Sequence, residues 1–342
     1  MSVSYPRPKT LQRLTWRSIL LVILLINPLP QTVIAQAKSN DNQATPSFWS
    51  NEWPRTNFQR SSVHFTEILS GGPPKDGIPS IDVPKFDTIA SQASIIGSKE
   101  PVISLEINGD ARAYPLRVLT WHEIVNDEVG GKRVAVTYCP LCNAAIVYDA
   151  TVNGEPSNFG TTGKLRNSDL IMYDRNTENW WQQFEGEAIV GDLTGAKLKQ
   201  VPSRLESFER FAGRFPNGKV LVPSNERMRQ YGANPYVGYD TSSRPFLYNG
   251  SMPNGIEPLA RVVAVGDKAW SLQSLRDKKS ITDGNLVLSW SEGQNSALDT
   301  RQINGGRDVG NVVVQRNGSD VAYDVTFAFV FHAFRPNGEL IF

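Results

Sequence analysis

Two cysteines, Cys139 and Cys142, form a C-x-x-C pair and are the only cysteines in the sequence. Two thiols at this spacing can hold a metal ion, close a disulfide or act as a free-thiol redox pair. A thioredoxin-like site needs the second cysteine in the first turns of a helix, but Ile146, Val147 and Tyr148 favour a strand there. No histidine follows Cys142 directly, which excludes a covalent haem attachment site. Metal binding is therefore the first interpretation, and a disulfide or a redox pair are the alternatives.

His122 lies upstream of this pair, on the inward face of a helix that the spacing of apolar residues predicts over 116–127. That helix leads into a predicted strand over 133–138, so the imidazole could reach both sulfur atoms. Two thiolates and one imidazole are a soft donor set that suits a single zinc, copper or iron ion. His332, in a predicted alternating strand over 321–334, is the candidate fourth ligand. The alternative for His122 is a core histidine bonded to a backbone carbonyl.

A second cluster, beside a Gly-rich turn, could bind a small polar or carbohydrate-like molecule. Its carboxylate and backbone groups would hold the ligand, and an indole ring would stack on it. The candidate ligand-binding residues are Asn167, Asp169, Asp174, Arg175 and Trp181. The alternative is turn chemistry, in which these side chains bond to the neighbouring backbone. The glycine spacing of nucleotide-binding loops and the Gly-x-Ser-x-Gly pattern are both absent from the sequence, which disfavours nucleotide binding and serine hydrolysis.

The elements that must position these residues are predicted to be short strands joined by turns. Alternating residues around Asn108-Gly109 indicate a hairpin, and a helix is predicted over 203–214 from a Ser203–Glu206 capping box. The predicted strands cover 102–107, 111–116, 133–138, 145–151, 170–173, 188–190 and 219–222. A content of 27 Gly and 22 Pro also indicates many turns. The predicted fold class is therefore a β-rich α+β fold with mostly antiparallel strands and a few short helices.

One pattern occurs twice in the chain. The matching segments are 113–119 with 269–275 and 134–138 with 286–290. We therefore predict two diverged hairpin-helix-strand units, over about 100–225 and 256–342, joined by a loop or lid over 226–255. At the positions of the three candidate ligands His122, Cys139 and Cys142, the second unit has Lys278, Ser291 and Gln294. Any chemistry is therefore expected in the first unit.

Composition excludes several classes of protein. The 342 residues are 40% hydrophobic, which is enough for a sizeable core and too much for a disordered chain. The 35 Lys and Arg residues against 34 Asp and Glu give a net charge of +1, so no nucleic-acid partner is expected. A small-molecule ligand is the partner class that the candidate sites suggest.

The first 37 residues have the order of features of a secretory signal peptide. Four basic residues precede the apolar run 19–26, two prolines follow it, and Ala35-Gln36-Ala37 offers a small-residue cleavage site. The run is shorter than the roughly 20 apolar residues of a spanning helix, so no stable membrane span is expected after cleavage, although an uncleaved anchor is the alternative. We predict a periplasmic or extracellular protein with an extended arm over 38–64 and a single domain over 65–342.

Six motifs occur together and are specific as a set. They are Leu69–Pro79, Trp121–Asp127, Thr137–Cys142, Asn167–Leu170, Met172–Arg175 and Gly186–Gly191. With them, the chain from about residue 65 to its carboxyl end resembles the family catalogued as domain of unknown function 3179. The resemblance implies a bacterial or archaeal protein, commonly exported, with no assigned reaction. The residues that fall on the family's pattern are His122, Cys139, Cys142, Asn167, Asp169, Asp174 and Arg175.

His332 has no counterpart in that pattern, so the fourth metal position could instead hold water, a substrate or Asp169. Two functions follow from the sequence. The first is an exported metalloprotein, redox or hydrolytic, centred on His122, Cys139 and Cys142. The second is a non-enzymatic binding module for a small ligand or carbohydrate, with the cysteine pair as a structural disulfide.

We expect the leader to be cleaved near Ala37, because the basic, apolar and small-residue regions stand in the order that signal peptidase requires. Removing its four basic residues leaves 31 Lys and Arg against 34 Asp and Glu, a net charge of −3. Amino-terminal sequencing of the exported protein checks the cleavage. Recovery of intact Met1 from a membrane fraction would contradict it.

Overall fold

The computed structural model describes residues 1–4 and 44–342, so the proposed cleavage site and most of the leader lie outside the described residues. The chain divides into two units, Met1–Gln36 and Ala37–Phe342. Residues 1–4 have no regular secondary structure, and the elements below belong to the second unit. Among the described residues, no helix is long and apolar enough to cross a membrane.

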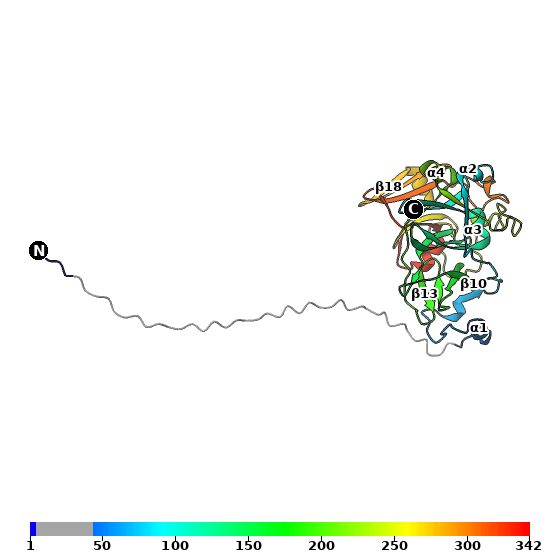
Figure 1. Cartoon of the computed structure of the whole chain (residues 1–342), viewed down its shortest axis with the longest axis horizontal. Helices are drawn as coiled ribbons and strands as arrows, with labels where there is room; N and C mark the ends of the chain where they lie inside the picture. Colours follow the sequence, from blue (N-terminus) through cyan, green and yellow to red (C-terminus); the bar gives the residue numbers. More distant parts are fainter. Residues whose placement is uncertain (5–43) are drawn as a thin grey trace. The chain divides into compact units, whose positions relative to one another are not determined.

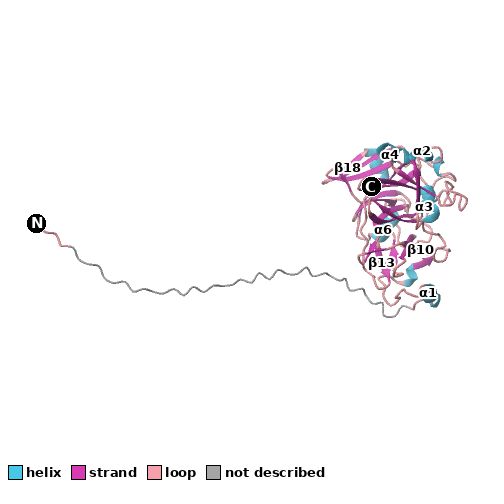
Figure 2. Ribbon diagram, in the orientation of Figure 1, coloured by secondary structure: helices cyan, strands magenta, loops and turns pink. Residues whose placement is uncertain are grey.

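The second unit consists of many short strands with a few short helices, which confirms the predicted β-rich composition (Figure 2). Its α-helices are α1 (Ser47–Glu52), α2 (Ile89–Gln92), α3 (Leu116–His122), α4 (Phe208–Arg214), α5 (Leu272–Lys278) and α6 (Ala328–Phe334). Its 3₁₀ helices are η1 (Phe65–Glu67), η2 (Tyr239–Thr241) and η3 (Ile303–Gly305). Most paired strands are antiparallel, as predicted.

One sheet has the strand order β14–β3–β4–β15–β2, with bounds Arg204–Ser207, Pro101–Ile107, Asp110–Pro115, Lys219–Val222 and Lys85–Thr88. β3 and β4 form the predicted hairpin. Its turn residues Asn108 and Gly109 have φ of +52° and +84°, the positive values of a type I′ turn. β14 is antiparallel to β3, whereas β15 is parallel to β4. Helix α3 follows β4, and α4 connects β14 to β15.

A second sheet has the strand order β22–β16–β17–β23, with bounds Asp324–Phe327, Arg261–Val265, Lys268–Ser271 and Glu339–Ile341. It repeats the arrangement of the first: β16 and β17 form a hairpin, β22 is antiparallel to β16 and β23 is parallel to β17. Helix α5 follows β17, and α6 connects β22 to β23. The hairpin, the helix after it and the two strands that flank the hairpin therefore occur twice in the same order.

The connecting helices α4 and α6 are each followed by Pro-Asn-Gly. A Cβ atom at Gly218 would lie 2.6 Å from the Phe211 ring, and one at Gly338 would lie 2.7 Å from the Phe331 ring. Only glycine fits under either ring, because such distances are shorter than van der Waals contact. This shared Pro-Asn-Gly is a signal of the repeat that the sequence comparison did not use.

Four further sheets complete the unit. β5–β6–β7 comprises Ile124–Val129, Lys132–Cys139 and Ala144–Asp149, and β18–β19–β20–β21 comprises Ser280–Asp283, Leu286–Ser291, Asn311–Arg316 and Ser319–Asp320. β1–β10–β11–β12–β13 comprises Ile68–Ser70, Phe159–Arg166, Asp169–Asp174, Trp180–Gln182 and Glu187–Val190, and β8–β9 comprises Thr151–Val152 and Glu155–Pro156.

The hydrophobic cores join these sheets. The largest core contains Ile103 and Tyr114 of the first sheet together with Val263 and Trp270 of the second, so the two sheets share a core. A second core surrounds the cysteine pair. The described part of the predicted arm packs on the sheet that contains β10, where Trp49 contacts Trp180 at 4.9 Å between ring centroids. In Figure 1, α1, β10 and β13 lie at one end of the unit, and α2, α4 and β18 lie at the other.

Three predicted elements have wrong boundaries. The helix over 116–127 ends at His122, because the β-branched residues that follow pair with β6 as strand β5. The helix over 203–214 begins only at Phe208, because Arg204–Ser207 pairs with β3. The predicted strand over 321–334 is helical from Ala328 onward, as α6. The first four residues of α6 are all buried, so the sequence there does not distinguish a buried from an exposed side of the element.

We expect Gly163→Ala to lower the free energy of unfolding by about 2–4 kcal/mol. Gly163 has φ +70°, and its Cβ would overlap the carbonyl oxygen of Pro73. Gly154→Ala is the matched control, since Gly154 has φ +83° with open space around it and should cost only about 1 kcal/mol. Denaturant unfolding of both variants measures the difference, and equal losses would contradict this packing.

Candidate functional site

The two cysteines lie on a tight turn between paired strands. β6 ends at Cys139 and β7 begins at Ala144, its antiparallel partner, so a strand follows the pair as predicted. The Cys142 N–H donates to the Cys139 carbonyl at 3.2 Å. Asn143, with φ +50°, donates its side-chain amide to the Val325 carbonyl at 2.7 Å. Both thiols are free and buried, which places two sulfur atoms together inside the protein.

Asp169, the first residue of β11, brings a carboxylate to the same place. One of its oxygens and the two sulfur atoms all lie within 4.8 Å of one another, and these three residues are the one such His/Cys/Asp/Glu group in the described chain. Oδ2 accepts hydrogen bonds from Gln182 Nε2 at 2.7 Å and from Phe184 N at 2.8 Å. Oδ1 is buried, and no N–H or O–H of the described residues donates to it. The carboxylate is thus fixed through Oδ2, and the neighbouring Cys142 thiol also helps to lower its pKa.

Glu123 adds a second buried carboxyl group. It caps the carboxyl end of α3 with φ +58°, and its side chain accepts no hydrogen bond from the described residues. Burial, with a smaller contribution from the charge of Asp169, raises the pKa of Glu123 to about 8. A second buried carboxyl group therefore lies near the group formed by the two thiols and Asp169.

Desolvation dominates the electrostatics of this site. Burial raises the pKa of Cys139 and of Cys142, and it raises the pKa of Asp169 to about 7 against the hydrogen bonds that lower it. Burial penalises the charged form of each group, and no basic side chain forms an ion pair with them in the described chain. The donors can all be ionised together only if a cation joins them.

The predicted loop or lid over 226–255, here called the covering loop, closes over the cysteine turn. Tyr239 Oη donates to the Leu141 carbonyl at 3.1 Å and accepts from Phe246 N at 3.3 Å. Ser168, which precedes Asp169, donates its hydroxyl to the Phe246 carbonyl. The covering loop is therefore bonded both to the cysteine turn and to the turn that carries the carboxylate.

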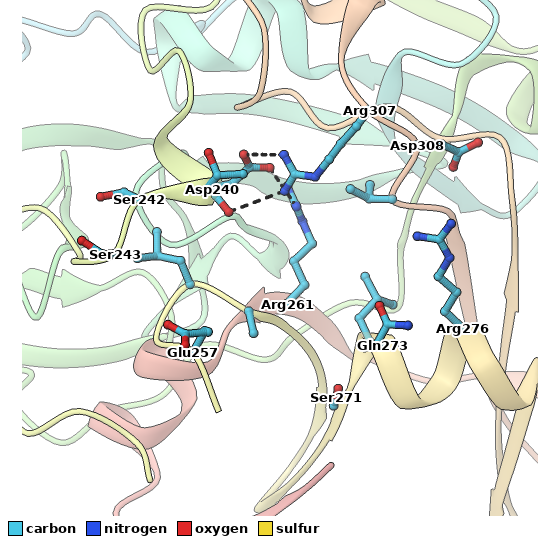
Figure 3. Close-up of a pocket in the computed structure, with 15 residues that line it drawn as sticks. Asp240, Ser242, Ser243, Glu257, Arg261, Ser271, Gln273, Arg276, Arg307 and Asp308 are labelled. Atoms are coloured by element: carbon cyan, nitrogen blue, oxygen red, sulfur yellow. Dashed lines mark hydrogen bonds and ion pairs between the residues drawn. The ribbon is translucent and has the colours of Figure 1, made fainter. Parts of the chain in front are cut away.

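A buried ion network anchors the covering loop at its middle (Figure 3). Asp240, whose side chain is fully buried, accepts from Arg261 Nη1 at 2.9 Å, from Arg307 Nη1 at 2.9 Å and from Ser296 Oγ at 2.5 Å. Burial alone would raise the pKa of Asp240, but the Arg261 charge and the bonds from Arg307 and Ser296 outweigh it and lower the pKa. Asp240 is therefore an ionised bridge between the loop and two arginines.

The structure does not bring His122 to the sulfur atoms. Its Nδ1 lies 2.8 Å from the Pro79 carbonyl and its Nε2 lies 2.8 Å from Tyr231 Oη, so both ring nitrogens are used. A carbonyl can only accept, which puts the proton on Nδ1 and leaves Nε2 to accept from Tyr231. The backbone carbonyl contact proposed as the alternative for His122 is present. The helix ends at this residue, and Glu123 follows it with a positive φ of +58°.

His332 also lies outside the sulfur group. It is on α6, and its Nε2 lies 3.0 Å from Ser251 Oγ. Because residues 328–334 are helical, the strand geometry on which its assignment as a ligand depended is absent. Asp169, the alternative to His332 in the sequence analysis, is the residue that lies with the two cysteines.

The predicted ligand-binding cluster serves several separate contacts. Asp174 accepts from Thr177 N at 2.7 Å and from Trp181 Nε1 at 3.0 Å, which is the turn chemistry of the alternative interpretation. Trp181 is 2% exposed and therefore presents no stacking face. Asn167 occupies the hairpin turn between β10 and β11 with φ +53°. Asp169 is the member of the cluster that joins the cysteines.

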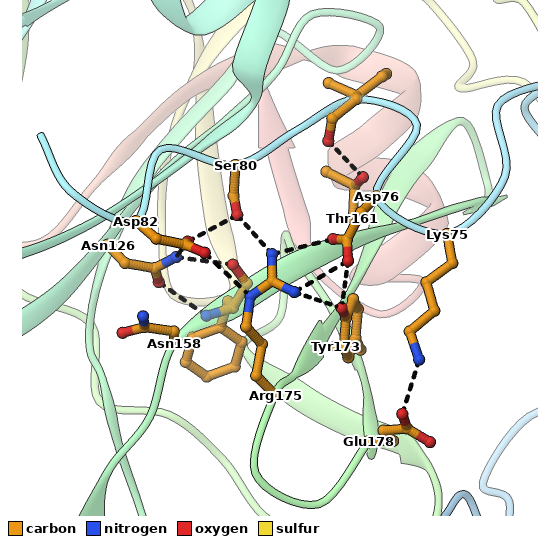
Figure 4. Close-up of polar contacts among 12 residues, drawn as sticks. Lys75, Asp76, Ser80, Asp82, Asn126, Asn158, Thr161, Tyr173, Arg175 and Glu178 are labelled. Carbon is orange, nitrogen blue, oxygen red and sulfur yellow. Dashed lines mark hydrogen bonds and ion pairs between the residues drawn. The ribbon is translucent and has the colours of Figure 1, made fainter. Parts of the chain in front are cut away.

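Arg175 fastens the Gly-Pro-rich loop to the sheet (Figure 4). Its guanidinium lies 2.9 Å from Asp76 Oδ2 and 3.3 Å from Asp82 Oδ2, and Tyr173 Oη donates to Asp76 Oδ2 at 2.6 Å. The same loop is held at Pro79 by His122. Arg175 and His122 are therefore explained by loop attachment.

Sequence reasoning missed Glu123 and Asp240. Glu123 is part of the Trp121–Asp127 motif. The predicted helix over 116–127 placed His122 on the inward face, so Glu123 was not considered. Asp240 lies in a segment without periodicity, and no local pattern reveals which arginines it meets.

The family described as "Protein of unknown function (DUF3179)" matches residues 75–338. The chain belongs to this family. No curated protein and no solved structure matches it. The matched residues include the first of the two sheets, the second sheet except β23, and the sulfur site, and the family has no assigned reaction.

We expect Asp240→Asn to lower the free energy of unfolding by about 3–5 kcal/mol, because it leaves the buried Arg261 guanidinium without its carboxylate. The lowered pKa of Asp240 also sets a sign: its stabilisation is complete above the unfolded pKa of about 4 and is lost as the pH falls below it. The variant should therefore lose less stability on acidification than the wild type.

Asp267→Asn is the control, since Asp267 is 85% exposed in its pair with Arg335 and should cost no more than about 1 kcal/mol. Denaturant unfolding at neutral and acidic pH measures both effects. Equal losses in the two variants would contradict the anchoring role of Asp240.

Proposed function

We propose that this chain is a metal-binding protein whose centre consists of Cys139, Cys142 and Asp169. The observation that carries the proposal is the gathering of three donor atoms within 4.8 Å of one another in a buried site. Zinc binds thiolate sulfur at about 2.3 Å and carboxylate oxygen at about 2.0–2.2 Å, so two of its ligands can be at most about 4.6 Å apart. The donors therefore need little movement to share one ion.

The chemistry of the donors supports a thiophilic transition metal. Two thiolates disfavour magnesium and calcium, while a mixed sulfur and oxygen set suits zinc, with iron or copper as the redox-active alternatives. The buried Oδ1 of Asp169, to which no N–H or O–H of the described residues donates, supports the same conclusion, because a cation removes the cost of burying a charged carboxylate.

Three protein ligands leave a fourth position on a tetrahedral ion for water or a substrate, the arrangement of catalytic zinc sites. A zinc ion would supply Lewis-acid chemistry there. Glu123 is a second buried carboxyl group, near enough to Asp169 for that charge to help raise its pKa. We therefore propose a hydrolytic centre if the ion is zinc, and a redox centre if it is iron or copper.

We also propose that the two sheets with the same strand order are diverged copies of one repeat. The second copy, over about 256–342, would then be a scaffold. The identical order and directions of β14–β3–β4–β15 and β22–β16–β17–β23 support this. Ser291 ends β19 as Cys139 ends β6, and it accepts a hydrogen bond from Arg210 at 2.6 Å. Export to the periplasm or the cell exterior is proposed from the leader sequence.

Metal analysis with thiol titration on the full chain, purified from the exporting compartment, tests the centre. We expect about one metal ion per chain in the wild type, and a loss of bound metal of about tenfold or more in Cys139→Ala, Cys142→Ser and Asp169→Asn. Ser291→Ala is the matched control from the second copy of the repeat, and this variant should keep its metal. His122→Gln should also keep it, because both ring nitrogens bond elsewhere.

Circular dichroism of each variant separates loss of the site from loss of the fold. Protein without metal and without titratable thiols would refute the proposal and favour the disulfide-containing binding module. Full metal content in Asp169→Asn would remove Asp169 from the centre.

A further inference from the structure

A cavity of about 310 Å³ lies beside the His122–Tyr231 pair and is separate from the metal-binding donors. It is enclosed by α2, α3, β15 and the start of the covering loop. Ile96, Val118 and Leu221 form an apolar floor and are each no more than 3% exposed. Concave, mostly apolar sites of this size with a few polar groups are typical of small-molecule binding.

One acidic side chain, Glu226, and two basic side chains, Arg117 and Arg229, line this cavity. Arg117 is neutralised, because its Nε lies 3.2 Å from the buried Glu100 and its Nη1 donates to the Ile95 carbonyl. Glu226 is exposed on the rim. Arg229 is half-buried, donates only to the Met228 carbonyl at 3.2 Å, and forms no ion pair with any described residue. Arg229 is therefore the cation of the cavity wall without a counter-charge.

Tyr231 cannot replace Arg229 as an anion-binding group. Its hydroxyl proton is donated to Nε2 of His122, since Nδ1 of that ring donates to the Pro79 carbonyl. Arg229 lines the same cavity as Tyr231, and its charge contributes to the lowered pKa of His122 after the larger effect of burial. An anionic ligand group would thus meet Arg229.

We propose that this cavity binds a small hydrophobic carboxylate, with its apolar body on Ile96, Val118 and Leu221 and its carboxylate on Arg229. Guanidinium and carboxylate match as a bidentate, charge-assisted pair. At roughly 30 Å³ for each water-sized group, the cavity has room for about ten non-hydrogen atoms. A straight-chain acid such as octanoate has this size.

Isothermal titration of the full chain with octanoate and with octanamide tests the proposal. The two probes have the same shape and size, and only octanoate is charged. We expect one octanoate site per chain and at least about tenfold weaker binding of octanamide, since a charged hydrogen bond is worth about 1.5–3 kcal/mol. Absence of octanoate binding, or equal affinity for the two probes, would overturn the proposal.

Arg229→Gln should remove the preference for octanoate, and the matched control Arg227→Gln, which does not line the cavity, should retain it. Ile95→Glu provides a second variant that does not depend on the core, because Ile95 is 51% exposed on the cavity wall. Its new charge should weaken octanoate binding by at least about tenfold. An unchanged affinity in Arg229→Gln or in Ile95→Glu would place the ligand elsewhere.

The proposal does not depend on the metal centre. Cys142→Ser should bind octanoate as the wild type does, so the two proposals fail separately.

Discussion

The backbone conformation of Glu123 is the constraint on which the candidate site depends. With φ +58°, this residue ends α3 and starts β5 in a different direction. Two consecutive motif residues thereby serve opposite sides of the chain: His122 bonds to Pro79 and Tyr231, while Glu123 joins the buried donors. Lys279 has φ +64° at the matching end of α5, so both copies of the repeated arrangement end this helix with a residue of positive φ.

The second determinant is the balance between desolvation and compensation. Asp240 and Asp169 are both buried carboxylates, yet their environments differ. Two guanidinium groups and a hydroxyl compensate Asp240, and its pKa falls. Asp169 has an amide and a backbone N–H on one oxygen, and its pKa rises to about 7. The first arrangement stabilises the ionised carboxylate without any ligand, whereas the second leaves ionisation of the carboxylate unfavourable unless a cation is bound, as in the proposed metal centre.

The sequence predicted what local chemistry determines. Turn preference predicted the Asn108-Gly109 hairpin, and β-branched residues predicted the strand after Cys142. Composition predicted the long loop over 226–255. Hydrophobic spacing failed where a short helix passes directly into a strand, as at His122 and at Phe327, because a few residues cannot establish a period. Asp169 was placed in a polar cluster near Trp181 and was also one alternative for the fourth metal position. Its approach to the cysteines depends on a contact between β11 and the cysteine turn that residue spacing does not reveal. The arginine partners of Asp240 are equally remote in the chain.

The two strands that pair in parallel with a hairpin strand, β15 and β23, have a consequence for folding. β15 pairs Lys219 with Arg112, a separation of 107 residues, whereas β23 pairs Glu339 with Lys268, a separation of 71. The first sheet cannot close until the chain of β5 to β13, which includes the cysteine turn and Asp169, has been brought inside this span. Long-range pairings must overcome the entropy of loop closure before they contribute any stability, so they form late. Donor assembly and sheet closure are therefore coupled steps, and an ion bound during folding would favour both.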